Sequence, residues 1–214
     1  MNLDPRRRAL PIGLALATLL SGGAARALPL LSEVLYDASG ADDGALFVEL
    51  HGAPGTSLDG YVVEGVNGAD GSVTHTLTLS GSIPEDGLFV IADEASGGGT
   101  LVAGADLLLN FDFQNGPDSV VLRDALGAVV DALGYGAFEA GEVFAGEGSP
   151  AADPPAGSSL ARVFADVDTD DNGVDFAALE APTPGSAPFS AVPEPAGGVL
   201  LLAGLAGLKL FGRR

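Results

Sequence analysis

The chain has 214 residues, and its 29 acidic residues far outnumber its nine lysines and arginines. All acidic residues except Asp4 lie within residues 28–195, where only Arg123 and Arg162 oppose them, so binding to nucleic acid or anionic lipid through this part is excluded. The absence of cysteine also excludes disulfides, thiolate metal sites and cysteine nucleophiles.

The N-terminus has the three parts of a secretory signal peptide. Three consecutive arginines precede an apolar stretch over residues 9–20, and Ala25 and Ala27 form an A-x-A cleavage site. A buried N-terminal helix is the alternative, but arginines directly before a short apolar stretch suit an export signal better. We therefore predict that residues 1–27 form a signal helix, which signal peptidase removes by cleaving after Ala27.

Short runs of β-branched residues, leucine and phenylalanine recur between the two ends, separated by turn-forming clusters of Gly, Asp, Asn and Pro. Several runs alternate between polar and apolar residues, as strands of antiparallel sheets do when one face is wet. We therefore expect an all-β fold, an immunoglobulin-like antiparallel β-sandwich over residues 28–187. The predicted strands are Leu31–Tyr36, Leu46–Leu50, Gly60–Val66, Val73–Leu79, Leu88–Ala92, Leu107–Phe111, Ser119–Arg123, Ala128–Leu133 and Ser159–Phe164.

The residues that most often carry catalysis do not form a recognisable motif. Neither His51 nor His75 has H-x-x-x-H or H-E-x-x-H spacing, and no serine has the G-x-S-x-G context of a hydrolase nucleophile. His75 is expected on the inward face of its strand. The sequence thus predicts a protein without catalytic residues.

An acidic loop at residues 166–175 is the sharpest candidate for a cofactor site. Its D-x-D-x-N-G pattern places oxygen ligands at the first, third and fifth positions of a calcium loop. The glutamate of the twelfth position is missing, because Leu179 stands there and Glu180 comes one residue late. Two alternatives stay open: a truncated Ca²⁺ site, or a turn whose Asp and Asn side chains bond the local backbone. The candidate ligands are Asp168, Asp170, Asn172 and Asp175.

Short motifs follow one another in a fixed order over about residues 30–187. The first half has Leu31–Leu35, Phe47–Leu50, Leu58–Tyr61 and Phe89–Asp93, and the second has Asp118–Leu122, Val129–Asp131, Gly134–Gly136, Ser159–Arg162, Asp168–Asn172, Asp175–Phe176 and Pro182–Gly185. This series resembles the bacterial lamin-tail domain. The resemblance implies an immunoglobulin-like sandwich that serves as a non-catalytic module in filament proteins, secreted nucleases and surface proteins.

The C-terminus combines a Pro-Glu-Pro motif, an apolar stretch and a basic end. The residues concerned are Pro193, Glu194 and Pro195, then the hydrophobic helix predicted within 196–214, and finally Arg213 and Arg214. This order resembles the PEP-CTERM sorting signal of Gram-negative bacteria, with residues 188–195 as a linker. The resemblance implies a transient inner-membrane anchor, retained by the two arginines and cut by an exosortase near Pro-Glu-Pro. A weak permanent tail anchor is the alternative.

Together these observations predict an exported, exosortase-sorted module with a structural or interaction role at the cell surface or in the extracellular matrix. Signal peptidase and exosortase are its expected partners during export, and a surface or matrix component is its expected partner afterwards. A Ca²⁺-dependent binding module for extracellular polysaccharide is the first alternative. The accessory domain of a secreted hydrolase is the second.

Overall fold

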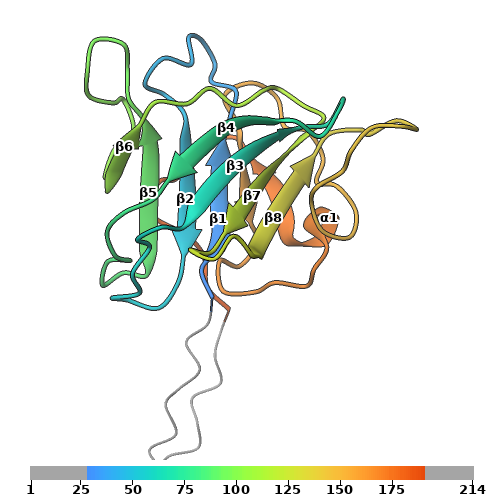
Figure 1. Cartoon of the computed structure of the whole chain (residues 1–214). Coiled ribbons are helices and arrows are strands. Elements are labelled where there is room, and N and C mark those ends of the chain that lie inside the picture. The colour runs from blue at the N-terminus through green and yellow to red at the C-terminus, as the bar shows by residue number, and fades with distance from the viewer. Residues whose placement is uncertain (1–27, 191–214) are drawn as a thin grey trace, which may run out of the picture.

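The structure is a computed structural model, and it describes residues 28–190. Two packed β-sheets make up this part of the chain (Figure 1). The six-stranded sheet has the order β10-β9-β1-β2-β5-β6, and the four-stranded sheet has the order β4-β3-β7-β8. The strands are β1 (Leu30–Leu35), β2 (Phe47–His51), β3 (Val62–Asn67), β4 (Val73–Thr78), β5 (Leu88–Asp93), β6 (Leu107–Leu109), β7 (Asp118–Arg123), β8 (Val129–Tyr135), β9 (Ser159–Arg162) and β10 (Phe176–Leu179), with helix α1 at Asn172–Asp175. The predicted signal helix and C-terminal helix lie outside the described residues.

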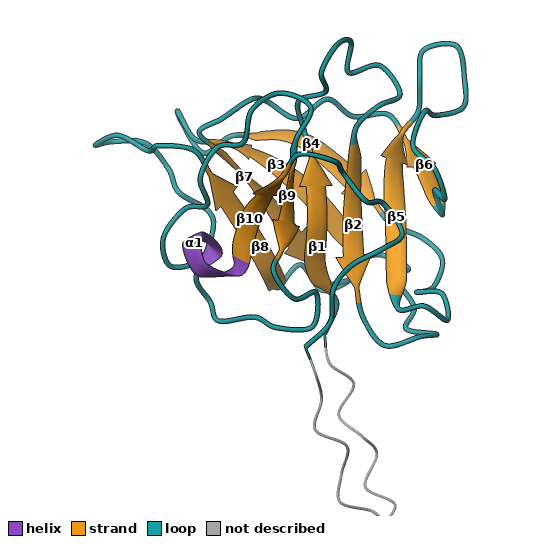
Figure 2. Cartoon of the chain, turned by 180° about the vertical axis from the view of Figure 1, so that it is seen from behind, coloured by secondary structure: helices purple, strands orange, loops and turns teal. Residues whose placement is uncertain are grey.

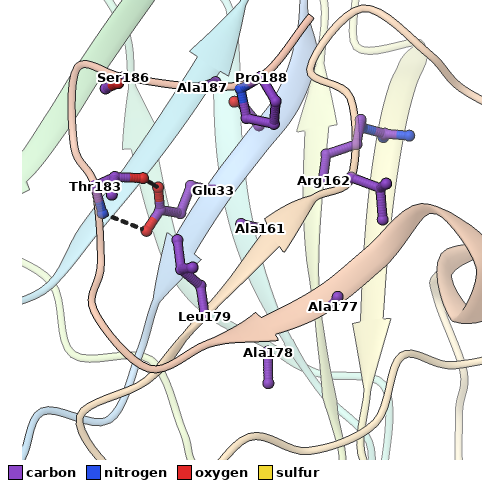
Figure 3. A pocket seen from close by; sticks show the side chains of 12 residues that line it. Glu33, Ala161, Arg162, Ala177, Ala178, Leu179, Thr183, Ser186, Ala187 and Pro188 are labelled. Carbon is purple, nitrogen blue, oxygen red and sulfur yellow. Dashed lines mark hydrogen bonds between the residues drawn. The ribbon is translucent and has the colours of Figure 1, made fainter. Parts of the chain in front are cut away.

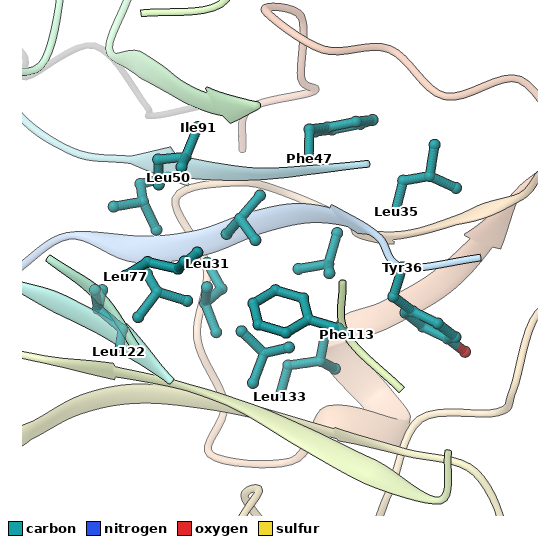
Figure 4. Close-up of a cluster of buried hydrophobic side chains, with 14 of the residues drawn as sticks. Leu31, Leu35, Tyr36, Phe47, Leu50, Leu77, Ile91, Phe113, Leu122 and Leu133 are labelled. Atoms are coloured by element: carbon teal, nitrogen blue, oxygen red, sulfur yellow. The ribbon is translucent and has the colours of Figure 1, made fainter. Parts of the chain in front are cut away.

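The alternating pattern of the strands produces the core, because every second side chain points between the sheets. Leu31, Leu50 and Ile91 enter it from the six-stranded sheet, and all three are fully buried. Leu122 and Leu133 approach from the four-stranded sheet, as Figure 4 shows. The expectation of an all-β fold is confirmed, and every predicted strand overlaps one of the observed strands.

Two local features differ from the prediction. Strands β5 and β6 run parallel, with Ile91 opposite Leu107, and differ in this from the predicted antiparallel pairing. The other strand pairs of the two sheets are antiparallel, as predicted. Strand β10 and helix α1 were not predicted, because Phe-Ala-Ala-Leu has neither β-branched residues nor alternation. Strand β10 owes its extended form to pairing with β9, where Ala177 lies opposite Ala161.

The last described segment, residues 180–190, crosses the outer face of the six-stranded sheet (Figure 2). We call it the strap. The backbone amides of Thr183 and Gly185 in the strap donate to side chains of β1 and β2, and the amide of Ala165 donates to the carbonyl of Pro188. The strap thus covers part of a sheet face that would otherwise be open.

Candidate functional site

A buried arginine organises the polar interior at one side of the sandwich. The Nη2 of Arg162 donates to both carboxylate oxygens of Asp131, at 3.0 and 2.8 Å, and Nη1 donates to Asp175 Oδ2 at 3.0 Å. Its Nε donates to the Leu31 carbonyl at 2.9 Å, and the guanidinium carbon lies 4.5 Å from the centre of the Phe176 ring. A guanidinium without exposed surface is stable only with such a full set of partners.

A third carboxylate makes the surroundings of this arginine negative. Asp168 Oδ1 lies 3.3 Å from Nη1 of Arg162 and is partly exposed to solvent. Asp131 and Asp175 are almost fully buried, so a single cation faces three carboxylates. The excess negative charge must be moderated by solvent, by a proton or by another cation.

The local sequence of the acidic loop explains how these groups are positioned. Asp171 caps α1 in an extended conformation, and its side chain accepts from the Gly173 amide at 3.1 Å. The short helix turns Asp175 inward, where the Thr169 amide and hydroxyl both donate to its carboxylate. The loop therefore delivers a carboxylate to the buried side chain of Arg162.

The structure does not gather the four predicted calcium ligands around one point. Asp168 and Asp175 contact Arg162, and Asp168 Oδ1 also accepts from the Asp170 amide at 3.1 Å. The amide group of Asn172 lies elsewhere, against strand β8. Within residues 28–190, Asp168, Asp170 and Asp175 form no group of three carboxylates close enough for one ion. The local backbone bonds are those of the turn alternative.

Asn172 instead completes the open edge of β8. Its Oδ1 accepts from the amides of Gly134 and Glu147, both at 2.8 Å, and its Nδ2 donates to the Ala132 carbonyl at 2.7 Å. A side-chain amide thereby imitates the peptide group of a neighbouring strand. Gly146 permits this approach, because a Cβ there would lie 2.4 Å from Asn172 Oδ1.

One group of three carboxylates in residues 28–190 has the spacing that an ion requires. Asp131, Glu147 and Asp168 offer oxygens within 4.8 Å of one another. The Oε2 of Glu147 is buried without a hydrogen-bond partner. Burial, followed by the charges of Asp131 and Asp168, raises the pKa of Glu147 to about 7. A proton on Glu147 or a hard cation would relieve this repulsion.

The existing bonds favour the proton. Both oxygens of Asp131 already accept from Arg162, and Asp131 Oδ2 also accepts from the Leu31 amide at 2.6 Å. A metal ion at this point would have to compete with those donors. Sequence reasoning missed Glu147, because it lies in a Gly-, Pro- and Ala-rich loop without a spacing motif.

A second polar cluster fastens the strap, and Figure 3 shows its bonds between Thr183 and Glu33 beside an apolar pocket. Thr183 donates to Glu33 through its amide, at 2.9 Å to Oε1, and through its hydroxyl, at 2.9 Å to Oε2. Glu49 accepts from the Ser32 hydroxyl at 2.8 Å and from the Gly185 amide at 2.6 Å. Burial raises the pKa of Glu49 to about 7, against the opposing effect of these donors.

The two histidines have packing roles. His51 lies at the end of β2, with Nδ1 3.1 Å from the Gly87 carbonyl, and burial lowers its pKa. Its ring centre is 5.1 Å from that of Phe189 in the strap. His75 lies edge-on to Phe113, with 5.9 Å between the ring centres, and is only partly buried.

The residues predicted for processing, Ala25, Ala27, Pro193, Glu194, Pro195, Arg213 and Arg214, lie outside the described residues. The two ends of the described chain lie at the same pole of the sandwich (Figure 1). Pro29 lies against Gly52, whose ideal Cβ position is 3.6 Å from Pro29 Cα, and Phe189 packs on the neighbouring His51. No helix in residues 28–190 is long and apolar enough to cross a membrane.

No protein-family profile matches this chain, and no curated protein matches it either.

Proposed function

We propose that the chain is an exported module that is held at the inner membrane by one pole until it is sorted, with the opposite pole facing its surroundings. Its role is structural or interactive rather than catalytic. The observation that carries the proposal is the position of the two described ends, because Pro29 and Phe189 contact adjacent residues of the chain, Gly52 and His51. The two described ends, to which the predicted sorting segments connect, therefore lie on the same side of the sandwich.

The proposal includes an immunoglobulin-like sandwich of the lamin-tail type. Support comes from motifs that are distant in sequence but join in one cluster. Glu33, Glu49 and Thr183 belong to three separate motifs of the lamin-tail resemblance, and together they hold the strap on the sheet. Arg162 and Asp131, from two further motifs, form the buried ion pair. These motif residues thus join the strap to the sheet and hold the buried arginine.

In this proposal the N-terminal segment directs export, and the C-terminal segment anchors the chain in the inner membrane until an exosortase cuts near Pro-Glu-Pro. The mature product is then strongly acidic, since both basic ends are lost. Its partners are a surface or matrix component, and nucleic acid is not among them, because the described surface repels phosphate. A polar surface of this charge also attracts divalent cations without a specific site.

The intact mass of the product tests the proposal most directly. The full chain is expressed in a Gram-negative host that contains an exosortase, and the expected product begins at Leu28 and ends near Pro195. Glu194→Gln should leave a longer product, whereas Glu180→Gln, the same change outside the motif, should be processed normally. A wild-type product that retains Phe211 would contradict the sorting mechanism, and one that retains Arg26 would contradict the export signal.

A further inference from the structure

Strand β4 forms an open edge of the four-stranded sheet, since β3 is its sole neighbour in that sheet. The Leu79 amide donates to the Tyr61 carbonyl at 2.8 Å, and the Leu79 carbonyl accepts from the Gly60 amide at 3.2 Å, so Leu79 directs both backbone groups toward the segment that leads into β3. Bonded and non-bonded pairs alternate along an antiparallel ladder. Thr76 and Thr78 therefore direct their backbone N–H and C=O groups away from β3. Within residues 28–190 these backbone groups have no partner on that side.

The opposite edge of the same sheet is closed. The side chain of Asn172 forms hydrogen bonds with the β8 backbone at Gly134 and Ala132, and Ala151 forms a parallel bridge with Tyr135. The two outer strands of the six-stranded sheet are shorter than β4, with three residues in β6 and four in β10. The edge of β4 is thus the longest open edge among the described strands.

The charge pattern also distinguishes β4. No charged residue lies between Asp70 and Glu85, although the chain has 29 acidic residues. Soluble proteins commonly protect an edge with charges, proline or a bulge. Here a register shift at the β3 residues Gly65 and Val66 disturbs the first part of the pairing, and residues 75–78 stay regular. The side chains of Thr76 and Thr78 are exposed and uncharged. The nearest charges belong to other segments: Glu64, opposite Thr76 on β3, is paired with Arg123, and Asp112 lies beside His75.

We propose that β4 is an interface for a second copy of this chain, paired strand to strand about a two-fold axis. The distribution of charge is the reason to expect a second copy of this chain as the partner. Two copies repel each other over most of their acidic surface. Along β4 they can meet through the uncharged side chains of Thr76 and Thr78, where the neighbouring carboxylate of Glu64 is already paired with Arg123. A basic partner would gain its affinity at the acidic faces instead. A two-fold axis makes an antiparallel edge complementary to itself, so the two four-stranded sheets become continuous.

Disulfide trapping tests this interface in the full chain, because the natural sequence has no cysteine. Thr74→Cys, Thr76→Cys and Thr78→Cys are made one at a time, oxidised alone and in pairwise mixtures, and analysed without reductant. Val129→Cys and Ala178→Cys place a thiol at exposed positions of β8 and β10 and serve as controls. We expect a covalent dimer at β4 positions at a rate at least several-fold above both controls. Raised salt should increase the yield, because it screens the repulsion between copies.

A second measurement separates the interface from random collision. Thr76→Lys is combined with Thr78→Cys, and Leu126→Lys, which adds the same charge at an exposed turn, serves as its control. The lysine on β4 should reduce trapping several-fold, while the one at residue 126 should leave it unchanged. Trapping at β4 no faster than at β8 and β10 would overturn the proposal. So would a β4 cysteine that is captured by a different polypeptide.

Discussion

Glu33 and Glu49 lie directly opposite each other on β1 and β2, and both are buried. Neither belongs to an ion pair in residues 28–190; each is held by hydroxyl and backbone N–H donors. Two carboxylates this close would repel each other if both were charged. Their donors come largely from the strap, so the strap and the charge state of the pair depend on each other.

The first prediction concerns pH. The pKa of Glu49 is raised to about 7 by burial, whereas the same group in the unfolded chain titrates near its ordinary value of 4.5. A raised pKa gives stability that is complete below the unfolded value and is lost as the pH rises through the folded value. We therefore expect the melting temperature to fall between about pH 5 and pH 8.

Glu49→Gln should flatten this decline and raise the melting temperature at pH 8, since the amide cannot ionise. For a domain of this size, each kcal/mol added to the free energy of unfolding raises the melting temperature by about 2–4 °C. Glu85→Gln, at an exposed loop residue, serves as the control and should keep the wild-type slope. An unchanged slope in the Glu49 variant would show that this carboxylate is already charged at neutral pH.

The second prediction compares the two arginines of the described chain. Arg162→Met leaves Asp131 and Asp175 buried without their cation, and we expect a loss of about 3–5 kcal/mol in the free energy of unfolding. Arg123→Met breaks a pair with Glu64 whose side chains are 33% and 17% exposed, and should cost about 0–1 kcal/mol. Urea unfolding of both variants measures the difference.

A variant too unstable to purify would leave this comparison incomplete, so Arg162→Lys is included. Lysine keeps the charge but cannot form the paired bonds to Asp131. The free energy of unfolding of the lysine variant should therefore lie between the values of the wild type and Arg162→Met. Equal stability of the lysine variant and the wild type would show that charge alone matters at this position.

The sequence could predict the strands because their signal is local. In β2 the alternation of Val48 and Leu50 with Glu49 and His51 predicts which side chains enter the core. It does not predict that Glu49, on the other face, is buried as well, because that burial depends on the distant strap. The polar clusters could not be predicted in this way. Arg162 finds Asp131 across 31 residues and the Leu31 carbonyl across 131 residues, and no spacing rule connects them.

The acidic loop shows why a motif can fit two different partners. The pattern that places oxygens around Ca²⁺ also places them around backbone N–H groups, because both need the same acceptors in a tight turn. The Oδ1 of Asn172 accepts hydrogen bonds from the amides of Gly134 and Glu147. Sequence alone could not distinguish the two uses, since the edge of β8 comes from a different part of the chain.

The third prediction separates these uses at Asn172. Asn172→Asp keeps an oxygen for the Gly134 amide but removes the Nδ2 donor to the Ala132 carbonyl. If Asn172 completes the β8 edge, the variant should lose about 1–3 kcal/mol of stability. A calcium ligand would behave in the opposite way, because an added carboxylate strengthens Ca²⁺ binding.

Thermal unfolding with Ca²⁺ and with chelator distinguishes the outcomes. We expect Asn172→Asp to melt below the wild type under both conditions. A variant that equals the wild type in chelator and exceeds it in Ca²⁺ would support the calcium loop and contradict the edge role.

The fourth prediction concerns the proton that we assign to Glu147. Its pKa of about 7 lies above the ordinary value, so its contribution to stability is present at low pH and is lost as the pH rises through 7. Glu147→Gln should therefore raise the melting temperature at pH 8 and change it little at pH 5, while Glu180→Gln at an exposed residue should change neither.

The Glu147 variant should also keep whatever stabilisation Ca²⁺ gives the wild type, because a general cation atmosphere does not depend on one carboxylate. If Ca²⁺ stabilises the wild type and the Glu180 variant but not the Glu147 variant, then Asp131, Glu147 and Asp168 bind a cation, and the proton assignment is wrong.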